Sequence, residues 1–112
     1  IGSYERALEQ CSAALEYDDI GMYGHLLNET VEAAVRCGAT DVAETAAAQL
    51  IERPRTNPTA TALGYAARAK ALTADGPAAE NEYRIAIREL ERSPLKVMSA
   101  RTHLIFGEWL RR

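Results

Sequence analysis

The sequence predicts an all-α fold of about six antiparallel helices, and three observations support this prediction. Apolar residues recur at spacings of three and four, which is the period of a helix with one buried face. No segment shows sustained strict alternation of apolar and polar residues, and β-branched residues are sparse, so strands are not expected. Three prolines each follow a residue of capping type, as at helix starts. The 112 residues fit a single helical domain, residues 1–112.

The first two helices are predicted from their apolar stripes. Residues 3–16 form one stripe, and the stretch 17–21 interrupts it. A second helix covers about residues 22–37 and ends at Gly38, because glycine is the commonest residue just past a helix C-terminus. The stripe residues are Tyr4, Leu8, Cys11 and Leu15 in the first helix and Leu27, Val31, Ala34 and Val35 in the second.

The remaining helices are predicted from their start signals. Thr40 or Asp41 opens the third helix, and Glu44 lies three residues after Asp41, which suits a capping box. Pro54 stops this helix after about residue 53. Proline at a first helical position loses no hydrogen bond, because the first N–H groups have no partner within the helix. By this signal Asn57–Pro58 opens the fourth helix, Gly76–Pro77 the fifth and Ser93–Pro94 the sixth.

Small and large residues at fixed spacings indicate that the helices pair. One spacing occurs twice: a small residue, a second residue four positions later and a third residue three positions after that. It is found at Ala43, Ala47 and Leu50, and again at Ala79, Tyr83 and Ala86. This pattern resembles the second helix of tetratricopeptide repeats, and Ala67 and Gly107 fit the small position of the first helix. The separations of 36 and 40 residues (43 to 79, 67 to 107) exceed the regular period, so the repeats are degenerate. We therefore expect tetratricopeptide-like hairpins, a fragment of an α-solenoid in which each hairpin covers the open face of the last.

The last predicted helix is apolar on more than one face. Gly107 lies inside its pattern, where glycine usually marks close helix–helix contact. No stop signal follows Arg112, so we expect a piece of a longer protein. A face left uncovered favours self-association, most simply as a two-fold dimer, unless the first helix folds back over it. The apolar residues are Leu104, Ile105, Phe106, Trp109 and Leu110, of which Phe106, Trp109 and Leu110 are the candidate self-association residues.

Three runs carry a family resemblance. Arg101-Thr-His-Leu followed by Phe106-Gly-Glu-Trp-Leu-Arg-Arg, with the upstream runs 66–72 and 79–91, resembles the helical-repeat region of large, ATPase-containing LuxR-family transcriptional regulators. The resemblance is strongest over residues 62–112 and weakens before that. It implies a bacterial parent protein in which this region relays signals between an ATPase module and a helix-turn-helix module. ATP and DNA would be ligands of the parent protein, because nothing here resembles either module.

Composition argues against several functions. The net charge is −3, with 13 basic and 16 acidic residues interspersed, whereas a nucleic-acid-binding domain carries a clustered basic excess. No apolar run approaches the roughly 18 residues of a membrane span. We therefore expect no direct nucleic-acid or membrane contact and a cytoplasmic location. Cys11 and Cys37 show no metal-ligand spacing and are expected to be buried free thiols, with a redox pair as the alternative.

No pattern of residues indicates catalysis or a cofactor. The chain has no glycine-rich phosphate loop, and His25 and His103 stand in no metal-binding arrangement. His103 lies near Phe106 on a packed side of its helix, which favours a partly buried structural or interface histidine. Asp18–Asp19 resembles a carboxylate pair only in composition, and a solvated turn is the simpler interpretation. We expect a protein that is not an enzyme and binds no cofactor or metal.

The repeat register provides the candidate binding residues. In such repeats the first helices line the concave side, which places Arg68, Arg101, Glu108 and Arg111 near that surface. Arginine offers forked donors to carboxylates, so this surface would suit an acidic peptide or protein segment. The expected function is a non-catalytic regulatory or protein-interaction segment of a LuxR-type regulator, whose partners are other domains of the parent protein. The alternative is a stand-alone adaptor that binds a peptide in its concave face.

Overall fold

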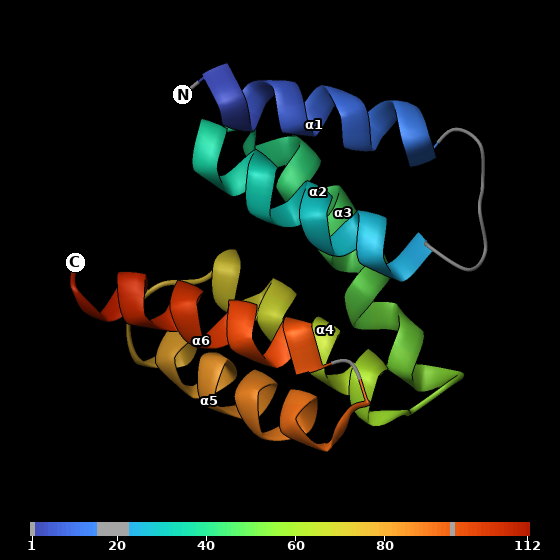
Figure 1. Ribbon diagram of the computed structural model, residues 1–112, viewed down its shortest axis with the longest axis vertical. Helices are drawn as coiled ribbons and strands as arrows, with labels where there is room; N and C mark the ends of the chain where they lie inside the picture. The colour runs from blue at the N-terminus through green and yellow to red at the C-terminus, as the bar shows by residue number, and fades with distance from the viewer. Residues whose placement is uncertain (1, 16–22, 95) are drawn as a thin grey trace.

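The computed structural model describes residues 2–15, 23–94 and 96–112, and this part of the chain is helical with no strand (Figure 1). The all-α prediction is therefore confirmed for these residues. The α-helices, with one 3₁₀ turn (η1), are α1 (Gly2–Leu15), α2 (Tyr23–Cys37), α3 (Thr40–Glu52), η1 (Arg53–Arg55), α4 (Ala60–Leu72), α5 (Gly76–Arg92) and α6 (Lys96–Leu110).

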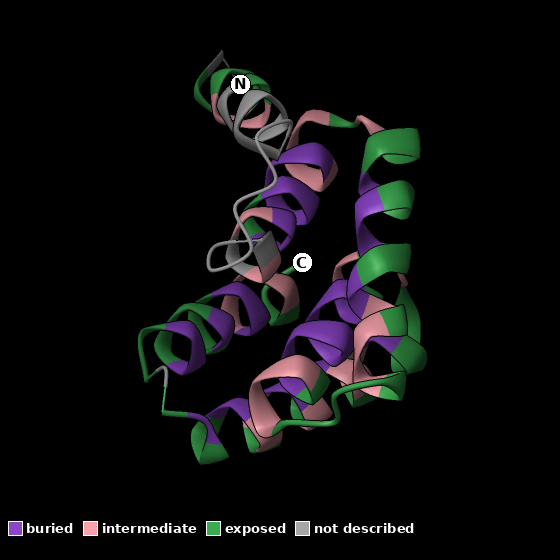
Figure 2. Cartoon of the chain, turned by 90° about the vertical axis from the view of Figure 1, so that its right-hand side faces the viewer, coloured by how far each residue is buried: buried purple, intermediate pink, exposed green. Residues whose placement is uncertain are grey.

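Helices that are neighbours in sequence pack against one another, and α2 also contacts α4. In Figure 1, α1, α2 and α3 form the upper part of the molecule, and α4, α5 and α6 form the lower part. Figure 2 shows the buried residues on the sides where helices face each other. The helix α4 therefore connects the two groups, because it contacts α2 of the upper part and α5 of the lower part.

Several helix starts differ from the prediction, and for α4 the capping residue explains the difference. The helix α4 starts two residues after Pro58, where the Thr59 hydroxyl accepts a hydrogen bond from the Ala62 N–H at 3.1 Å. The helix α3 starts at Thr40, one of its two predicted starts, but the residue at its N-cap is Ala39, which makes no side-chain bond, so the capping box predicted at Asp41 is wrong. The helix α6 starts at Lys96, also later than predicted.

Glycine ends α2 as predicted. Gly38 has a φ of +78°, the left-handed region that glycine adopts at no steric cost. The Ala39 N–H donates to the Ala34 carbonyl oxygen at 2.8 Å, and the Gly38 N–H donates to that of Val35 at 3.3 Å. These two bonds satisfy carbonyl groups at the end of the helix.

Two groups of buried side chains form the core. The first is built mainly from α2, α3 and α4, with one residue each from α5 and α6, and includes Leu27, Leu50, Leu90 and Met98. The second joins α5 to α6 through Tyr83, Ile105 and Phe106. Of the positions predicted from small-and-large spacing, Gly107 is only half-buried, and the others are buried: Ala43, Ala47, Leu50, Ala67, Ala79, Tyr83 and Ala86.

The close helix–helix contact occurs at a different glycine from the one predicted. A Cβ atom placed on Gly107 would meet no atom within 4 Å, so Gly107 does not mark close packing. A Cβ atom on Gly64 of α4 would instead lie 2.5 Å from the Leu90 Cγ of α5. Glycine at position 64 therefore permits the tight contact between α4 and α5.

Candidate functional site

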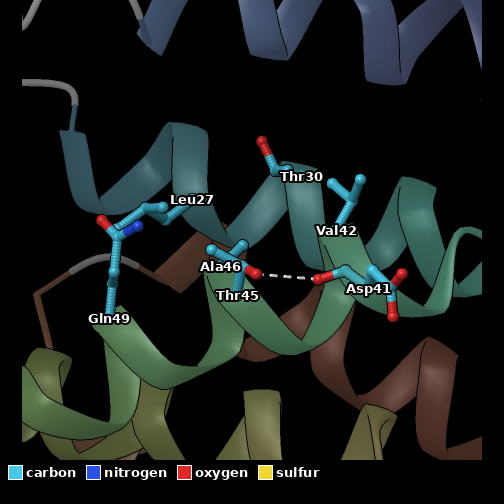
Figure 3. A pocket seen from close by; sticks show the side chains of 7 residues that line it. All are labelled: Leu27, Thr30, Asp41, Val42, Thr45, Ala46 and Gln49. Carbon is cyan, nitrogen blue, oxygen red and sulfur yellow. Dashed lines mark hydrogen bonds between the residues drawn. The ribbon is translucent and has the colours of Figure 1, made fainter.

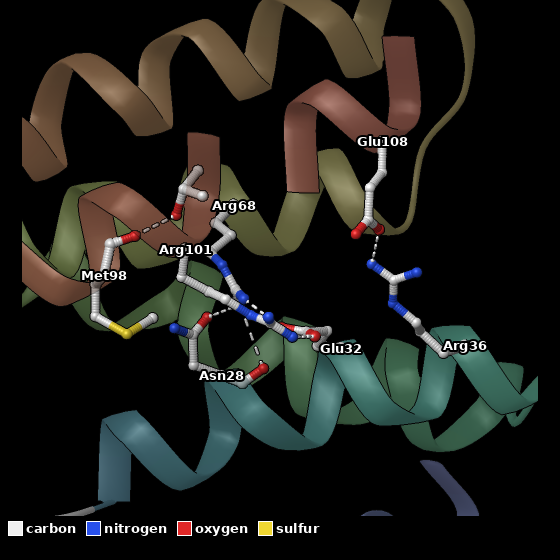
Figure 4. Close-up of polar contacts among 8 residues, drawn as sticks. Asn28, Glu32, Arg36, Arg68, Met98, Arg101 and Glu108 are labelled. Atoms are coloured by element: carbon white, nitrogen blue, oxygen red, sulfur yellow. Dashed lines mark hydrogen bonds and ion pairs between the residues drawn. The ribbon is translucent and has the colours of Figure 1, made fainter. Parts of the chain in front are cut away.

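Side chains from α2 and α4 form a buried polar network around Arg68 (Figure 4). The Arg68 side chain is only 1% exposed. Its Nη1 donates to the Asn28 Oδ1 at 2.6 Å, and its Nη2 donates to the Glu32 Oε1 at 2.7 Å. A buried charge is tolerated when it is paired and hydrogen-bonded in this way. The network thus joins α2 to α4 through charge-assisted bonds.

A second arginine reaches the same carboxylate from α6. The Arg101 Nε donates to the Glu32 Oε1 at 3.3 Å, and its Nη2 donates to the Glu32 Oε2. Glu32 is 8% exposed, whereas the Arg101 side chain is 44% exposed. One carboxylate of α2 therefore binds one buried and one partly exposed arginine, from α4 and α6 (Figure 4).

A separate ion pair links α2 to α6 one helical turn further along. The Arg36 Nη2 lies 2.6 Å from the Glu108 Oε2. The Arg36 guanidinium also lies over the Tyr4 ring of α1, with its Cζ 5.4 Å from the ring centre. Figure 4 shows this pair beside the network around Glu32. Two ionic contacts therefore span the space between α2 and α6.

The electrostatic environment differs between the arginines. Burial lowers the pKa of Arg68, although the Glu32 carboxylate opposes that shift. The hydrogen bond to Glu32 raises the pKa of Arg101. For Arg36, burial acts to lower the pKa, but the hydrogen bond and charge of Glu108 outweigh it, so the pKa is raised. Three arginines face two glutamates, Glu32 and Glu108, which leaves a positive excess among these five side chains.

The Glu108 carboxylate should titrate below its ordinary pKa of 4.5, because the hydrogen bond and charge of Arg36 favour its ionised form. A depressed folded-state pKa adds stability above the unfolded pKa, and this stability is lost as the pH falls through the folded value. An NMR titration of the Glu108 carboxyl carbon in the wild type and in Arg36→Gln measures this pKa. In the variant, the pKa of Glu108 should lie closer to its ordinary value. A wild-type Glu108 that titrated at or above 4.5 would contradict the pairing.

The structure brings together three of the four predicted concave-face residues. Arg68 and Arg101 share Glu32, and Glu108 pairs with Arg36 between the same helices. Arg111 is exposed and donates from its Nε to the Gly107 carbonyl oxygen at 3.3 Å. Because Arg68 is buried, its guanidinium is engaged by side chains of this chain and does not form part of an open surface. Binding of a partner by these four residues stays a prediction.

The partners on α2 were missed by the sequence-based prediction, although a signal was present. Asn28, Glu32 and Arg36 follow one another at spacings of four, so they lie on one face of the helix. They adjoin the apolar positions Leu27 and Val31, where a stripe of polar residues signals a polar contact with another helix. All three take part in the contacts described above.

The candidate self-association residues differ in exposure. Phe106 is buried, with its ring 5.2 Å from that of Tyr83, and Trp109 is half-buried, 5.6 Å from Tyr83. Leu110 is 53% exposed. Leu104 is also exposed, and Val97, which the sequence analysis did not select, is more exposed still. The apolar surface that α6 leaves open therefore consists of Val97, Leu104 and Leu110 rather than of Phe106.

Several single-residue predictions can be placed. His103 is 54% exposed and its Nε2 lies 3.2 Å from the Glu91 Oε1, so the prediction of a packed histidine is wrong. Cys37 is a free, half-buried thiol. Asp18 and Asp19 lie outside the described residues, as do the side chains of Cys11 and His25.

The described residues contain no group of three or more His, Cys, Asp or Glu side chains that could hold a metal ion. Within the same ranges, no helix has both the length and the apolar character needed to cross a membrane.

A cavity of about 350 Å³ between α2 and α3 offers little for chemistry (Figure 3). Its lining includes Leu27, Val42 and Ala46. The two hydroxyl groups in its wall are used within their own helices, since Thr30 donates to the Leu26 carbonyl oxygen and Thr45 to that of Asp41. The polar contacts between α2, α4 and α6 therefore remain the better candidate site.

Comparisons of the chain with protein-family models, with curated proteins and with solved structures find no match.

Proposed function

We propose that this chain is a non-catalytic, tetratricopeptide-like interaction segment of a LuxR-type transcriptional regulator. The observation that supports it best is the meeting of Glu32, Arg68 and Arg101 from α2, α4 and α6. These are alternate helices along the chain, the helices that line one side of a repeat stack. Ionic contacts between them tie one hairpin to the next. Such contacts suit a segment that passes a signal from one module to another.

The reading frame that encodes the chain tests this proposal first. An ATPase module upstream and a helix-turn-helix downstream would support the regulator. In such a parent protein, Arg101→Gln should alter reporter induction without changing the DNA affinity of the helix-turn-helix module. Arg55→Gln serves as the control, because Arg55 is exposed on the η1 turn, away from the network. Equal induction by the wild type and Arg101→Gln would contradict a role in signal relay.

The second candidate function is a stand-alone adaptor that binds an acidic peptide. The partly exposed Arg101 and the positive excess of the polar network favour it. A reading frame without either module would support the adaptor over the regulator.

The segment itself should neither hydrolyse ATP nor bind duplex DNA. The chain carries 16 acidic against 13 basic residues, so its net charge opposes the binding of a polyanion such as DNA. Fluorescence anisotropy with labelled duplex DNA at low and moderate salt, together with a phosphate-release assay, checks this. Salt-sensitive submicromolar DNA binding would show that the prediction is wrong.

The segment should self-associate through the exposed side of α6. Leu104 and Leu110 are exposed, and burying such side chains between two copies is favourable. Leu110→Glu should shift the monomer–dimer equilibrium toward the monomer in analytical ultracentrifugation. Leu63→Glu is the matched control, because Leu63 is an exposed leucine on α4. A wild type that sediments as a monomer at high micromolar concentration would exclude this dimer.

A further inference from the structure

A second cavity, of about 520 Å³, lies between α1–α2 and the helices α4, α5 and α6. This volume falls within the range of small-molecule sites, roughly 300–1,000 Å³. Three aromatic side chains and three charged side chains line it, together with aliphatic residues: Tyr4, Tyr83, Trp109, Arg36, Arg112 and Asp75. The cavity thus combines apolar walls with a few polar groups.

The aromatic walls belong to different helices. Tyr83 of α5 and Trp109 of α6 have ring centres 5.6 Å apart. Tyr4 of α1 lines the same cavity and carries the Arg36 guanidinium over its ring. Aromatic side chains bury large apolar areas with few rotatable bonds. An apolar ligand body would therefore contact preformed rings contributed by several helices.

The Tyr83 hydroxyl supplies a donor that the protein does not use. The Tyr83 side chain is 2% exposed, and its hydroxyl has no hydrogen-bond partner among the described residues. Burial raises the pKa of Tyr83, while the positive charges of Arg68, Arg112 and Arg36 act to lower it. Tyr83 itself lines the cavity together with Arg36 and Arg112, so it borders the space that a ligand would fill.

Arg36 has unused donors at the same cavity. Its Nη2 bonds to Glu108, and its Nε is buried away from solvent, so a ligand in the cavity would reach the remaining N–H groups of the two Nη atoms. A guanidinium has five N–H donors, so Arg36 can bind a second acceptor without losing the first. Two arginines face one aspartate in the lining, which favours an anionic ligand over a cationic one.

We propose that this cavity binds a small amphipathic carboxylate, which accepts hydrogen bonds from the Tyr83 hydroxyl and the Arg36 guanidinium. The apolar body of the ligand lies against Tyr4 and Trp109. The proposal rests on the proposed regulatory function and names the class of effector that the segment would bind. Residues of both α2 and α6 line the cavity. A bound ligand would therefore contact the two helices that are linked by the ion pairs Arg36–Glu108 and Glu32–Arg101.

Trp109 is the only tryptophan of the chain and lines the cavity, so its fluorescence reports occupancy. The probes are 4-phenylbutyrate, 4-phenylbutanol and 4-phenylbutylamine, which share a body and differ in charge. The carboxylate should give a saturable change with a dissociation constant on the order of 1 mM or below, as ligands of this size do. The alcohol and the amine should bind about tenfold more weakly or not at all, since a hydrogen bond to a charged group is worth about that factor.

Three variants test the assigned residues. Tyr83→Phe keeps the ring and removes the hydroxyl, and it should weaken carboxylate binding by about tenfold. Glu108→Gln removes the carboxylate that competes for Arg36, and it should tighten binding. Arg88→Gln should change nothing, because Arg88 is exposed on α5 and does not line the cavity. Circular dichroism confirms that each variant folds.

Absence of a saturable fluorescence change with the carboxylate would overturn the proposal. Equal binding of the carboxylate and the amine would also overturn it, as would a Tyr83→Phe variant with wild-type affinity. These outcomes are distinct from failure of the proposed function, because Arg101→Gln tests signal relay in the parent protein without any added ligand.

Discussion

Tyr83→Ala should lower the free energy of unfolding by about 3–5 kcal/mol, the loss typical of truncating a large buried aromatic residue. Tyr83 is 2% exposed, and its ring stacks on Phe106 at 5.2 Å and lies 5.6 Å from Trp109. Removing it would take one ring from a cluster of three, in which Phe106 and Trp109 also contact each other, and would open a cavity between α5 and α6. Chemical denaturation followed by circular dichroism measures the loss.

The control for this truncation is Tyr83→Phe, which keeps the stacked ring. Because the hydroxyl has no partner among the described residues, its removal should change the free energy of unfolding by less than about 1 kcal/mol. Leu110→Ala, at an exposed position on α6, should also have a small effect. A loss below about 1 kcal/mol for Tyr83→Ala would show that the ring contributes little to the core, against the large-to-small rule.

The burial of Tyr83 was predictable because it depends on local spacing. Ala79, Tyr83 and Ala86 lie on one side of a helix whatever the rest of the fold does, and all are buried. The starts of the helices were less predictable. Proline fits several positions near a helix start. In α4 the start is instead determined by Thr59, which directly precedes the first helical residue and whose hydroxyl accepts a hydrogen bond from the Ala62 N–H.

The candidate site was predictable only in part. The repeat spacing predicted that Arg68 and Arg101 lie on the same side of the molecule, and both contact Glu32. The sequence did not reveal Glu32 as their partner, because that pairing depends on how closely α6 approaches α2. This approach depends on contacts between helices that are far apart in the sequence, and local spacing does not encode such contacts.

The apolar residues of α6 show the same limit. The spacing correctly indicates more apolar side chains than one face can hold, but it does not say which face meets α5. Phe106 faces Tyr83 and is buried, while Leu104 and Leu110 remain exposed. The identity of the uncovered residues became clear only from the packing of α5 against α6.

Glu32→Leu should lower the free energy of unfolding by about 3–5 kcal/mol, because it leaves a buried charge without its partner. The Arg68 side chain is 1% exposed, so water cannot solvate its charge once the Glu32 carboxylate is removed. Arginine also keeps its proton under ordinary conditions, so the cost appears as lost stability rather than as a neutral side chain. Arg101 is 44% exposed and can be solvated, so its loss of Glu32 should add little. Urea denaturation at neutral pH measures the change.

Adding Arg68→Met to Glu32→Leu should recover most of the lost stability. The double variant replaces the buried pair by apolar side chains, an exchange that is often neutral or stabilising. Arg68→Met alone should cost less than Glu32→Leu, because Glu32 retains Arg101 as a partner. A double-mutant cycle therefore should give a large coupling energy between positions 32 and 68. If the double variant were no more stable than Glu32→Leu, the loss would come from packing around position 32. The unpaired charge of Arg68 would then not be its cause.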